Sequence, residues 1–144
     1  MPEIYNAEAV TEVFGHWPSF HDAEVVRLRL ERTSSYAAGP RLLADIHAFE
    51  VTSEIDPQGR YVLRHHVLIS LQFDGVQDLE LSDFNNQNAL SEITFKPIAS
   101  AAFPEPAYEV VFDAAHGVSA AFRCRQVTVL AVCPWEVGTG EPAA

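Results

Sequence analysis

Histidine is the residue type in this chain with the clearest capacity for chemistry. His21, Asp22 and Glu24 stand together, and His65 and His66 are neighbours farther along. Imidazole and carboxylate groups bind metal ions and move protons, so the first group is a candidate for a metal-binding or hydrolytic site. Adjacent strand residues point to opposite faces, so His65 and His66 cannot ligate one ion from the same side.

The spacing of these groups favours a structural role. The sequence contains no Gly-rich phosphate loop, no CxxC, no HExxH and no nucleophile elbow. We therefore expect no catalytic residues, no metal ligands and no cofactor. Asp22 is expected to accept backbone N–H groups at a turn, and His21 to bond a carbonyl. A metal-binding or hydrolytic protein that uses His21, Asp22 and Glu24 remains the alternative function, and an uncharacterised structural domain is a further one.

The elements that position these residues begin with a helix. Apolar residues recur at helical spacing at Ile4, Ala7, Val10, Val13 and Phe14. This pattern predicts a helix over residues 5–14. Asn6 is a candidate cap, and Gly15 can end the helix in a left-handed conformation.

After Asp22 the apolar period changes to that of strands. Strands are predicted over residues 25–31, 41–53, 60–73 and 127–132. The buried face of the first is expected to carry Val26, Leu28 and Leu30. One face of the third is expected to carry Tyr61, Leu63, Val67, Ile69, Leu71 and Phe73. A hairpin near residues 115–117 is expected to join 108–112 to 118–122.

Turn chemistry predicts how two of these strands pair. The segment 56–59 has Asp, Pro and Gly where a type I turn prefers them. A four-residue loop there sets Ile46 opposite Ile69 and Ala48 opposite Val67, so the apolar faces coincide. The same register places His65 opposite Glu50.

A second turn is expected directly after this pair of strands. Phe73-Asp74-Gly75 would form a three-residue loop with glycine at the left-handed position of a bulge. That loop would pair Ile69 with Leu79 and Val67 with Leu81.

The predicted class is α+β, a short N-terminal helix packed on a mostly antiparallel, hairpin-connected sheet that is curved or folded into a sandwich. The absence of strand–helix–strand alternation argues against a doubly wound parallel sheet. The 144 residues suit a single domain over residues 1–137. A small, polar, flexible tail is expected over residues 138–144.

Charge narrows the class of partner. Nine Lys and Arg face twenty Asp and Glu, which gives a net charge of −11. A phosphate backbone or an anionic membrane would repel such a chain, so we expect neither nucleic-acid nor membrane binding. The start Met1-Pro2-Glu3-Ile4 lacks the features of a signal peptide, and a cytoplasmic location is expected. Acidity favours a basic protein partner, or only keeps the domain soluble.

Several blocks of the sequence resemble one protein family. The most specific are Phe14-Gly15-His16-Trp17-Pro18-Ser19-Phe20-His21-Asp22-Ala23-Glu24-Val25 and Asp83-Phe84-Asn85-Asn86-Gln87-Asn88. Weaker ones are Phe73-Asp74-Gly75-Val76, Leu79 with Leu81, and Phe122-Arg123-Cys124. These blocks resemble the bacterial immunity proteins of polymorphic toxin systems, in the group numbered fifty. The resemblance implies a non-enzymatic protein that neutralises a cognate toxin.

The family motif is expected to be structural and the binding surface to lie elsewhere. Residues 74–113 contain eight acids against Lys96 alone, a net of −7. An inhibitor of a basic toxin gains association rate and specificity from such a field. The motif residues expected to hold the helix–sheet junction are Trp17, Pro18, Phe20, His21, Asp22 and Glu24. The expected partner-binding residues are Asp78, Glu80, Asp83, Asn85, Asn86 and Asn88. A homodimer is the other partner that we consider.

Overall fold

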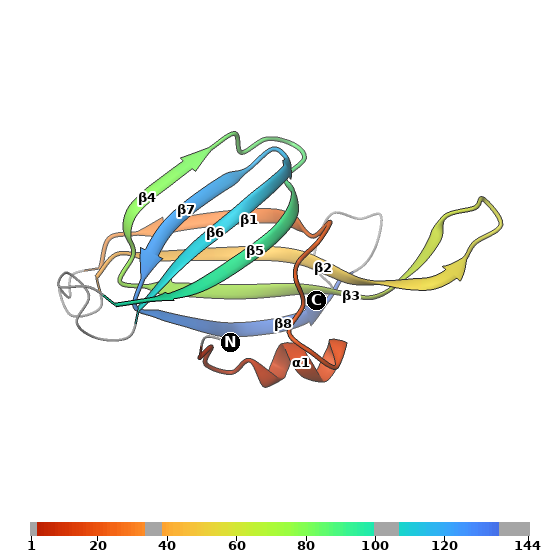
Figure 1. The fold of residues 1–144 in the computed structure, drawn as a ribbon, viewed down its shortest axis with the longest axis horizontal. Coiled ribbons are helices and arrows are strands. Elements are labelled where there is room, and N and C mark those ends of the chain that lie inside the picture. Colours follow the sequence, from red (N-terminus) through yellow and green to blue (C-terminus); the bar gives the residue numbers. More distant parts are fainter. Residues whose placement is uncertain (1–2, 34–38, 100–106, 136–144) are drawn as a thin grey trace.

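The computed structural model describes residues 3–33, 39–99 and 107–135. Within them, the helix α1 (Glu8–Phe14) precedes eight strands. The strands are β1 (Glu24–Glu31), β2 (Arg41–Ile55), β3 (Tyr61–Asp74), β4 (Gln77–Ser82), β5 (Ala89–Ile98), β6 (Ala107–His116), β7 (Ser119–Cys124) and β8 (Gln126–Pro134). They form one open sheet in the order β4-β7-β6-β5-β1-β2-β3-β8 (Figure 1). The expected α+β class, a short helix with a mostly antiparallel sheet, is confirmed.

The sheet has two halves that meet at a narrow seam. We name strands β4, β5, β6 and β7 the acidic half, and strands β1, β2, β3 and β8 the arm half. Across the seam, β1 and β5 share one pair of Cα partners, Glu24 and Ala89. The halves nevertheless share a core, because the Phe73 ring of β3 packs against three rings of the acidic half. These are Phe95, Phe112 and Phe122, with centroids 6.5, 6.0 and 4.9 Å away.

The register predicted for the β2–β3 hairpin is confirmed for its inner pairs only. Nearer the turn it is wrong, because the register shifts twice and Glu50 has Arg64, not His65, as its Cα partner. Ile46 faces Ile69 and Ala48 faces Val67. In the turn, the Gly59 N–H donates to the Asp56 carbonyl at 2.9 Å, as the Asp-Pro-Gln-Gly pattern requires. The inner register buries one apolar face of both strands, and two register shifts separate it from the turn.

The predicted β6–β7 hairpin is also confirmed. Its Cα partners include Val110 with Phe122 and Phe112 with Ala120. All four of these side chains are buried, which pins the register. The last predicted strand corresponds to β8.

The predicted pairing of β3 with β4 is wrong. β3 pairs with β8, and β4 pairs with β7. Gly75 does adopt the left-handed conformation, with φ 69°. It sends the chain to the far edge of the acidic half instead of back along β3. Buried Val127 and Val129 of β8 fill the place beside β3 that the prediction gave to Leu79.

The buried face predicted for β1 is only partly correct. Leu28 packs against the core, but Val25 is buried in place of Val26, and Leu30 is 55% exposed. The register on β2 shifts between Val25 and Arg27. A bulge there turns successive side chains to the other face, which simple alternation cannot predict.

Helix α1 begins later than predicted. Asn6 has φ 62° and donates from its amide to the Val129 carbonyl at 3.0 Å, so it does not cap the helix. Gly15 ends the helix as predicted, with φ 80° and its N–H on the Thr11 carbonyl. The helix lies beside β8 in Figure 1, where Val10 is fully buried. The tail expected over residues 138–144 lies outside the described residues.

The outer ends of β2 and β3 project from the body as a two-stranded ribbon (Figure 1). We name residues 50–65 the arm. Tyr61 and Leu63, predicted to lie on the buried face of β3, are 61% and 40% exposed. That part of the prediction is wrong because the pairing of β1 with β2 ends at His47 and that of β8 with β3 ends at Val67.

Candidate interaction surface

The acids of residues 74–113 lie mainly on the acidic half. Asp78 and Glu80 are exposed on β4, which pairs with β7 on one side and forms an edge of the sheet, and Asp83 is exposed just after it. Asp78 lies 3.8 Å from the Arg123 guanidinium. Asp74 differs, because it accepts a hydrogen bond from Arg41 of the arm half at 2.9 Å. Glu105 lies outside the described residues.

The outer face of the acidic half places two acids directly opposite each other. Glu92 of β5 is the Cα partner of Asp113 of β6, and both are exposed. Like charges at facing positions destabilise a strand pair. Farther along, Lys96 faces Glu109. The acidic half therefore keeps negative charge on an open strand surface.

Asn88 is a structural residue. Only 3% of it is exposed, and its Oδ1 accepts hydrogen bonds from the Asn85 and Val118 N–H groups at 2.8 and 3.2 Å. Its amide nitrogen donates to the Asn85 and Val25 carbonyls. Asn88 thus ties the loop after β4 to β1 and to the start of β7. Its side chain is occupied inside the protein, while Asn85 and Asn86 are exposed.

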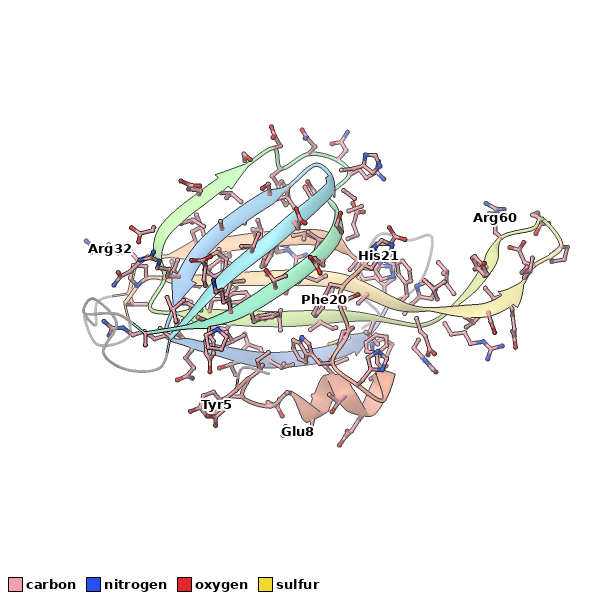
Figure 2. All side chains as sticks on the ribbon, in the orientation of Figure 1. Tyr5, Glu8, Phe20, His21, Arg32 and Arg60 are labelled. Atoms are coloured by element: carbon pink, nitrogen blue, oxygen red, sulfur yellow. The ribbon has the colours of Figure 1, made fainter. Side chains whose placement is uncertain are left out.

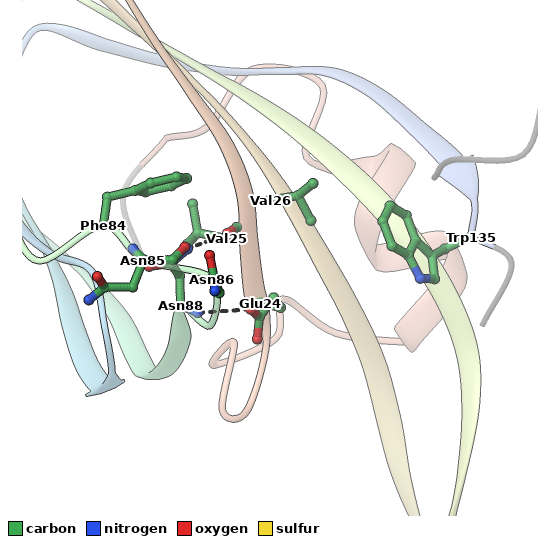
Figure 3. Close-up of a pocket in the computed structure, with 8 residues that line it drawn as sticks. All are labelled: Glu24, Val25, Val26, Phe84, Asn85, Asn86, Asn88 and Trp135. Carbon is green, nitrogen blue, oxygen red and sulfur yellow. Dashed lines mark hydrogen bonds between the residues drawn. The ribbon is translucent and has the colours of Figure 1, made fainter. Parts of the chain in front are cut away.

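A pocket opens beside this loop (Figure 3). It is lined by Glu24, Val25, Val26, Phe84, Asn85, Asn86, Asn88 and Trp135. Phe84 is 47% exposed, so the loop presents an aromatic ring as well as amides. In Figure 3 the Asn88 N–H donates to the Glu24 carboxylate, at 2.8 Å. That hydrogen bond fixes the pocket wall across the seam.

The motif segment over residues 17–24 holds the seam through its backbone. Ser19 accepts from the Ile93 N–H, and Asp22 donates to the Leu90 carbonyl, at 3.1 and 2.8 Å. Leu90 in turn donates to Ala23 at 2.8 Å. The segment therefore runs along β5 before the chain enters β1. Two non-glycine residues, Phe20 and Asp22, have φ of 68° and 63° to make this turn.

The three polar groups of the motif serve different partners. His21 is exposed, and its Nδ1 lies 3.1 Å from the Ser91 carbonyl, as expected. Asp22 is 56% exposed, with a carboxylate oxygen 3.6 Å from the His21 Nε2. Glu24, rather than Asp22, accepts a hydrogen bond from a backbone N–H, that of Asn88. The three side chains of the expected cluster thus have different surroundings. His21 lies beside a carbonyl, Asp22 is exposed to solvent, and Glu24 accepts a backbone N–H.

The aromatic residues of the motif pack inward. The Trp17 ring meets Phe20 and Phe95 edge-on, with centroids 5.7 and 6.0 Å apart. Phe20 is buried and Pro18 half-buried. Figure 2 shows Phe20 pointing into the body, while His21 lies on the side from which the arm projects. These contacts attach the segment after α1 to the acidic half.

A histidine–aromatic cluster, not predicted from the sequence, lies at the base of the arm. The His47 Nε2 lies 2.9 Å from the His66 Nδ1, and the His47 ring stacks on Trp135 with centroids 4.7 Å apart. Burial, followed by the neighbouring His66, lowers the pKa of His47 to about 4. The register of the β2–β3 hairpin contained the information, because it sets His47 opposite Leu68 and so diagonal to His66.

Residues 3–33, 39–99 and 107–135 offer little other chemistry. No group of three or more His, Cys, Asp or Glu is arranged there to hold a metal ion. Burial, and then Asp74, raises the pKa of the Cys124 thiol to about 12, so its thiolate is not populated at neutral pH. None of the described helices has the length and apolar character needed to cross a membrane.

Comparison with known proteins identifies one family. Residues 6–135 match the family model described as Immunity protein 50. The matched range covers α1 and all eight described strands. No curated protein and no solved structure matches the chain.

Proposed function

Because the chain belongs to the Immunity protein 50 family, we propose that it neutralises a cognate, basic toxin by binding it, without catalysis of its own. The observation that carries this proposal is the family match over residues 6–135, which includes both halves of the sheet. The exposed acids of the acidic half support a basic partner, because complementary fields speed encounter and exclude wrong partners. The cytoplasm is the compartment in which we place this binding.

We place the contact on the outer face and edge of the acidic half. Asp78, Glu80 and Asp83 follow the edge strand β4 and its loop. Glu92 and Asp113 repel each other in the free protein. A basic partner would relieve this repulsion, which makes the free energy of binding more favourable. Contact with this surface needs no movement of the strands.

The loop after β4 supplies directional contacts beside the charges. Asn85 and Asn86 are exposed at its tip, next to the Phe84 ring. Asn88 contributes indirectly, because its buried hydrogen bonds hold the loop in place. The loop thus combines amides and an aromatic ring on a fixed backbone, which lowers the entropy lost on binding.

The first experiment tests the function itself. A candidate toxin encoded beside this gene is expressed in a bacterial host with and without the protein. We expect growth arrest by the toxin alone, rescue by the protein, and a stable complex of the two purified chains. Rescue without a complex, or a complex without rescue, contradicts neutralisation by binding.

The second experiment tests the surface by charge reversal. Asp78→Lys, Glu80→Lys and Asp83→Lys are combined in one variant, and Glu3→Lys, Glu8→Lys and Glu12→Lys in a matched control. We expect the first set to slow association with the toxin about tenfold at low salt and the control to change it little. The difference should shrink as salt shortens the Debye length to about 3 Å near 1 M. Equal, small effects from both sets, with a salt-independent association rate, would exclude this surface.

A further inference from the structure

The arm is a two-stranded ribbon that extends beyond the rest of the sheet. β1 follows β2 only as far as His47, and β8 follows β3 only as far as Val67. Figure 2 shows Arg60 near the tip of the arm, well away from the body. A two-stranded hairpin without a covering layer is only marginally stable in water. The arm therefore exposes surface that a partner would stabilise.

The arm has one apolar face. Val51 is the Cα partner of Leu63, and Ile55 is the partner of Tyr61, so these four side chains share a face. They are 48%, 40%, 64% and 61% exposed, in that order. An exposed, contiguous set of large apolar residues is a common feature of interaction sites.

Two ion pairs join the strands of the arm. The Arg64 guanidinium contacts the Glu54 carboxylate, and His65 Nδ1 lies 2.6 Å from Glu50 Oε2. These pairs cross between the two strands and hold the ribbon in register. The charged groups of these pairs are thus matched within the arm.

The arm is also nearly neutral in a strongly acidic chain. Residues 50–65 contain three acids and two arginines, a net of −1, so the other residues carry −10 of the total −11. A basic toxin finds an acidic surplus of only one charge on the arm. A second copy of the chain, repelled by the acidic bodies, meets the least repulsion there.

We propose that the arm is a self-association surface, on which the apolar faces of two arms pack against each other about a two-fold axis. Each strand of the arm is about 20 Å long, from six residues at roughly 3.3 Å each. Antiparallel arms keep the two acidic bodies at opposite ends, about two Debye lengths apart at physiological salt. Low net charge, an apolar face and projection from the body together make this dimer compatible with the acidity of the chain.

The dimer is weak and reversible. The four half-exposed apolar side chains of each copy bury at most about 800 Å² in total, which is the range of weak, transient interfaces below about 1,200 Å². Dissociation in the micromolar range is therefore expected. Because the bodies repel each other, added salt strengthens this dimer, whereas it weakens binding of a basic toxin to the acidic half.

The test is sedimentation equilibrium of the full chain from about 1 to 500 µM, at 50 and 500 mM salt. We expect a reversible monomer–dimer equilibrium that tightens several-fold at high salt. Ile55→Ser with Tyr61→Ser should leave a monomer at every concentration. Leu81→Ser with Leu130→Ser, which changes two exposed leucines outside the arm, should dimerise like the wild type. Unchanged melting temperatures show that both variants fold.

A charge variant distinguishes loss of dimerisation through the arm from loss of dimerisation by unfolding. Arg60→Glu leaves the apolar face intact but takes the arm from −1 to −3. We expect dimerisation at least tenfold weaker at 50 mM salt and largely restored at 500 mM. A monomeric wild type overturns the proposal, as does a serine double variant that still dimerises. Loss of toxin binding by that variant, with a monomeric wild type, would assign the arm to the toxin instead.

Discussion

The two halves of the sheet contribute to one core but differ in how the charged side chains on their outer faces are paired. In the arm half, cations bind the acids: Arg27 lies 2.7 Å from Asp45, and Arg41 lies 2.9 Å from Asp74. In the acidic half, Glu92 and Asp113 face each other across two strands. The strands of each half carry acids in similar number, so the difference lies in their arrangement.

This contrast shows how one fold can present two surfaces. Ion pairs within a sheet contribute little to stability at the surface, but they remove free charge from it. In the arm half, the proposed contact through the arm is therefore apolar and acts only at short range. The acidic half keeps a field that acts beyond contact distance. The following predictions test whether the halves are joined by the core, the seam and the turn described above.

The largest expected effect is at the core contact between the halves. Phe73→Ala removes the ring that touches three aromatic rings of the acidic half, and should lower the free energy of unfolding by about 3–5 kcal/mol. Urea unfolding followed by tryptophan fluorescence and by far-UV circular dichroism measures it. Phe84→Ala, at a 47% exposed ring, is the control and should cost less than about 1 kcal/mol. Two separate transitions in the wild type would show that the halves do not share a core.

The next effect is at the seam. Asn88→Ala leaves the Asn85 and Val118 N–H groups without their acceptor inside the protein. Each unsatisfied buried group costs about 1–3 kcal/mol, so we expect a loss of about 2–4 kcal/mol in chemical denaturation. The exposed neighbour gives the matched control: Asn86→Ala should stay within about 0.5 kcal/mol. Similar values for the two variants would contradict the structural role of Asn88.

A smaller effect depends on pH and belongs to the arm half. The unfolded chain protonates His47 near pH 6.5, whereas the folded chain does so near pH 4 because burial and His66 lower the pKa. The stability contributed by neutral His47 is complete above pH 6.5 and is lost as the pH falls from 6.5 to about 4. We expect the wild type to lose about 1 kcal/mol more than His47→Gln between pH 7.5 and 5, after allowance for partial exposure. Equal losses in the two proteins would contradict the shift.

The smallest effect concerns the left-handed turn of the motif. Asp22 has φ 63°, a conformation that glycine adopts without a steric cost and alanine does not. Asp22→Ala should therefore be about 1 kcal/mol less stable than Asp22→Gly in thermal unfolding. If Asp22→Gly is the less stable variant, the carboxylate matters more than the backbone conformation.

Local patterns were enough for the hairpins whose turns and apolar faces agree. The alternation of β2 and β3 sets the pairing of Ile46 with Ile69, although two register shifts separate this pair from the Asp-Pro-Gln-Gly turn. The β6–β7 hairpin follows for the same reason. β5 was not predicted, because Pro97 and the charges at Glu92 and Lys96 interrupt its apolar pattern.

The sequence by itself determined the fold class, the β6–β7 hairpin and the inner pairs of the β2–β3 hairpin, because these depend on periodicity and turn residues close together in the chain. The family followed from the resemblance of blocks such as residues 14–25. Only the tertiary structure decided that β8 pairs with β3 and that β4 pairs with β7. Long-range pairing depends on which buried faces fit together, and several choices satisfy the same alternation. The same holds for the arm: Tyr61 and Leu63 carry a core pattern, but no neighbouring strand among the described residues reaches far enough to cover them.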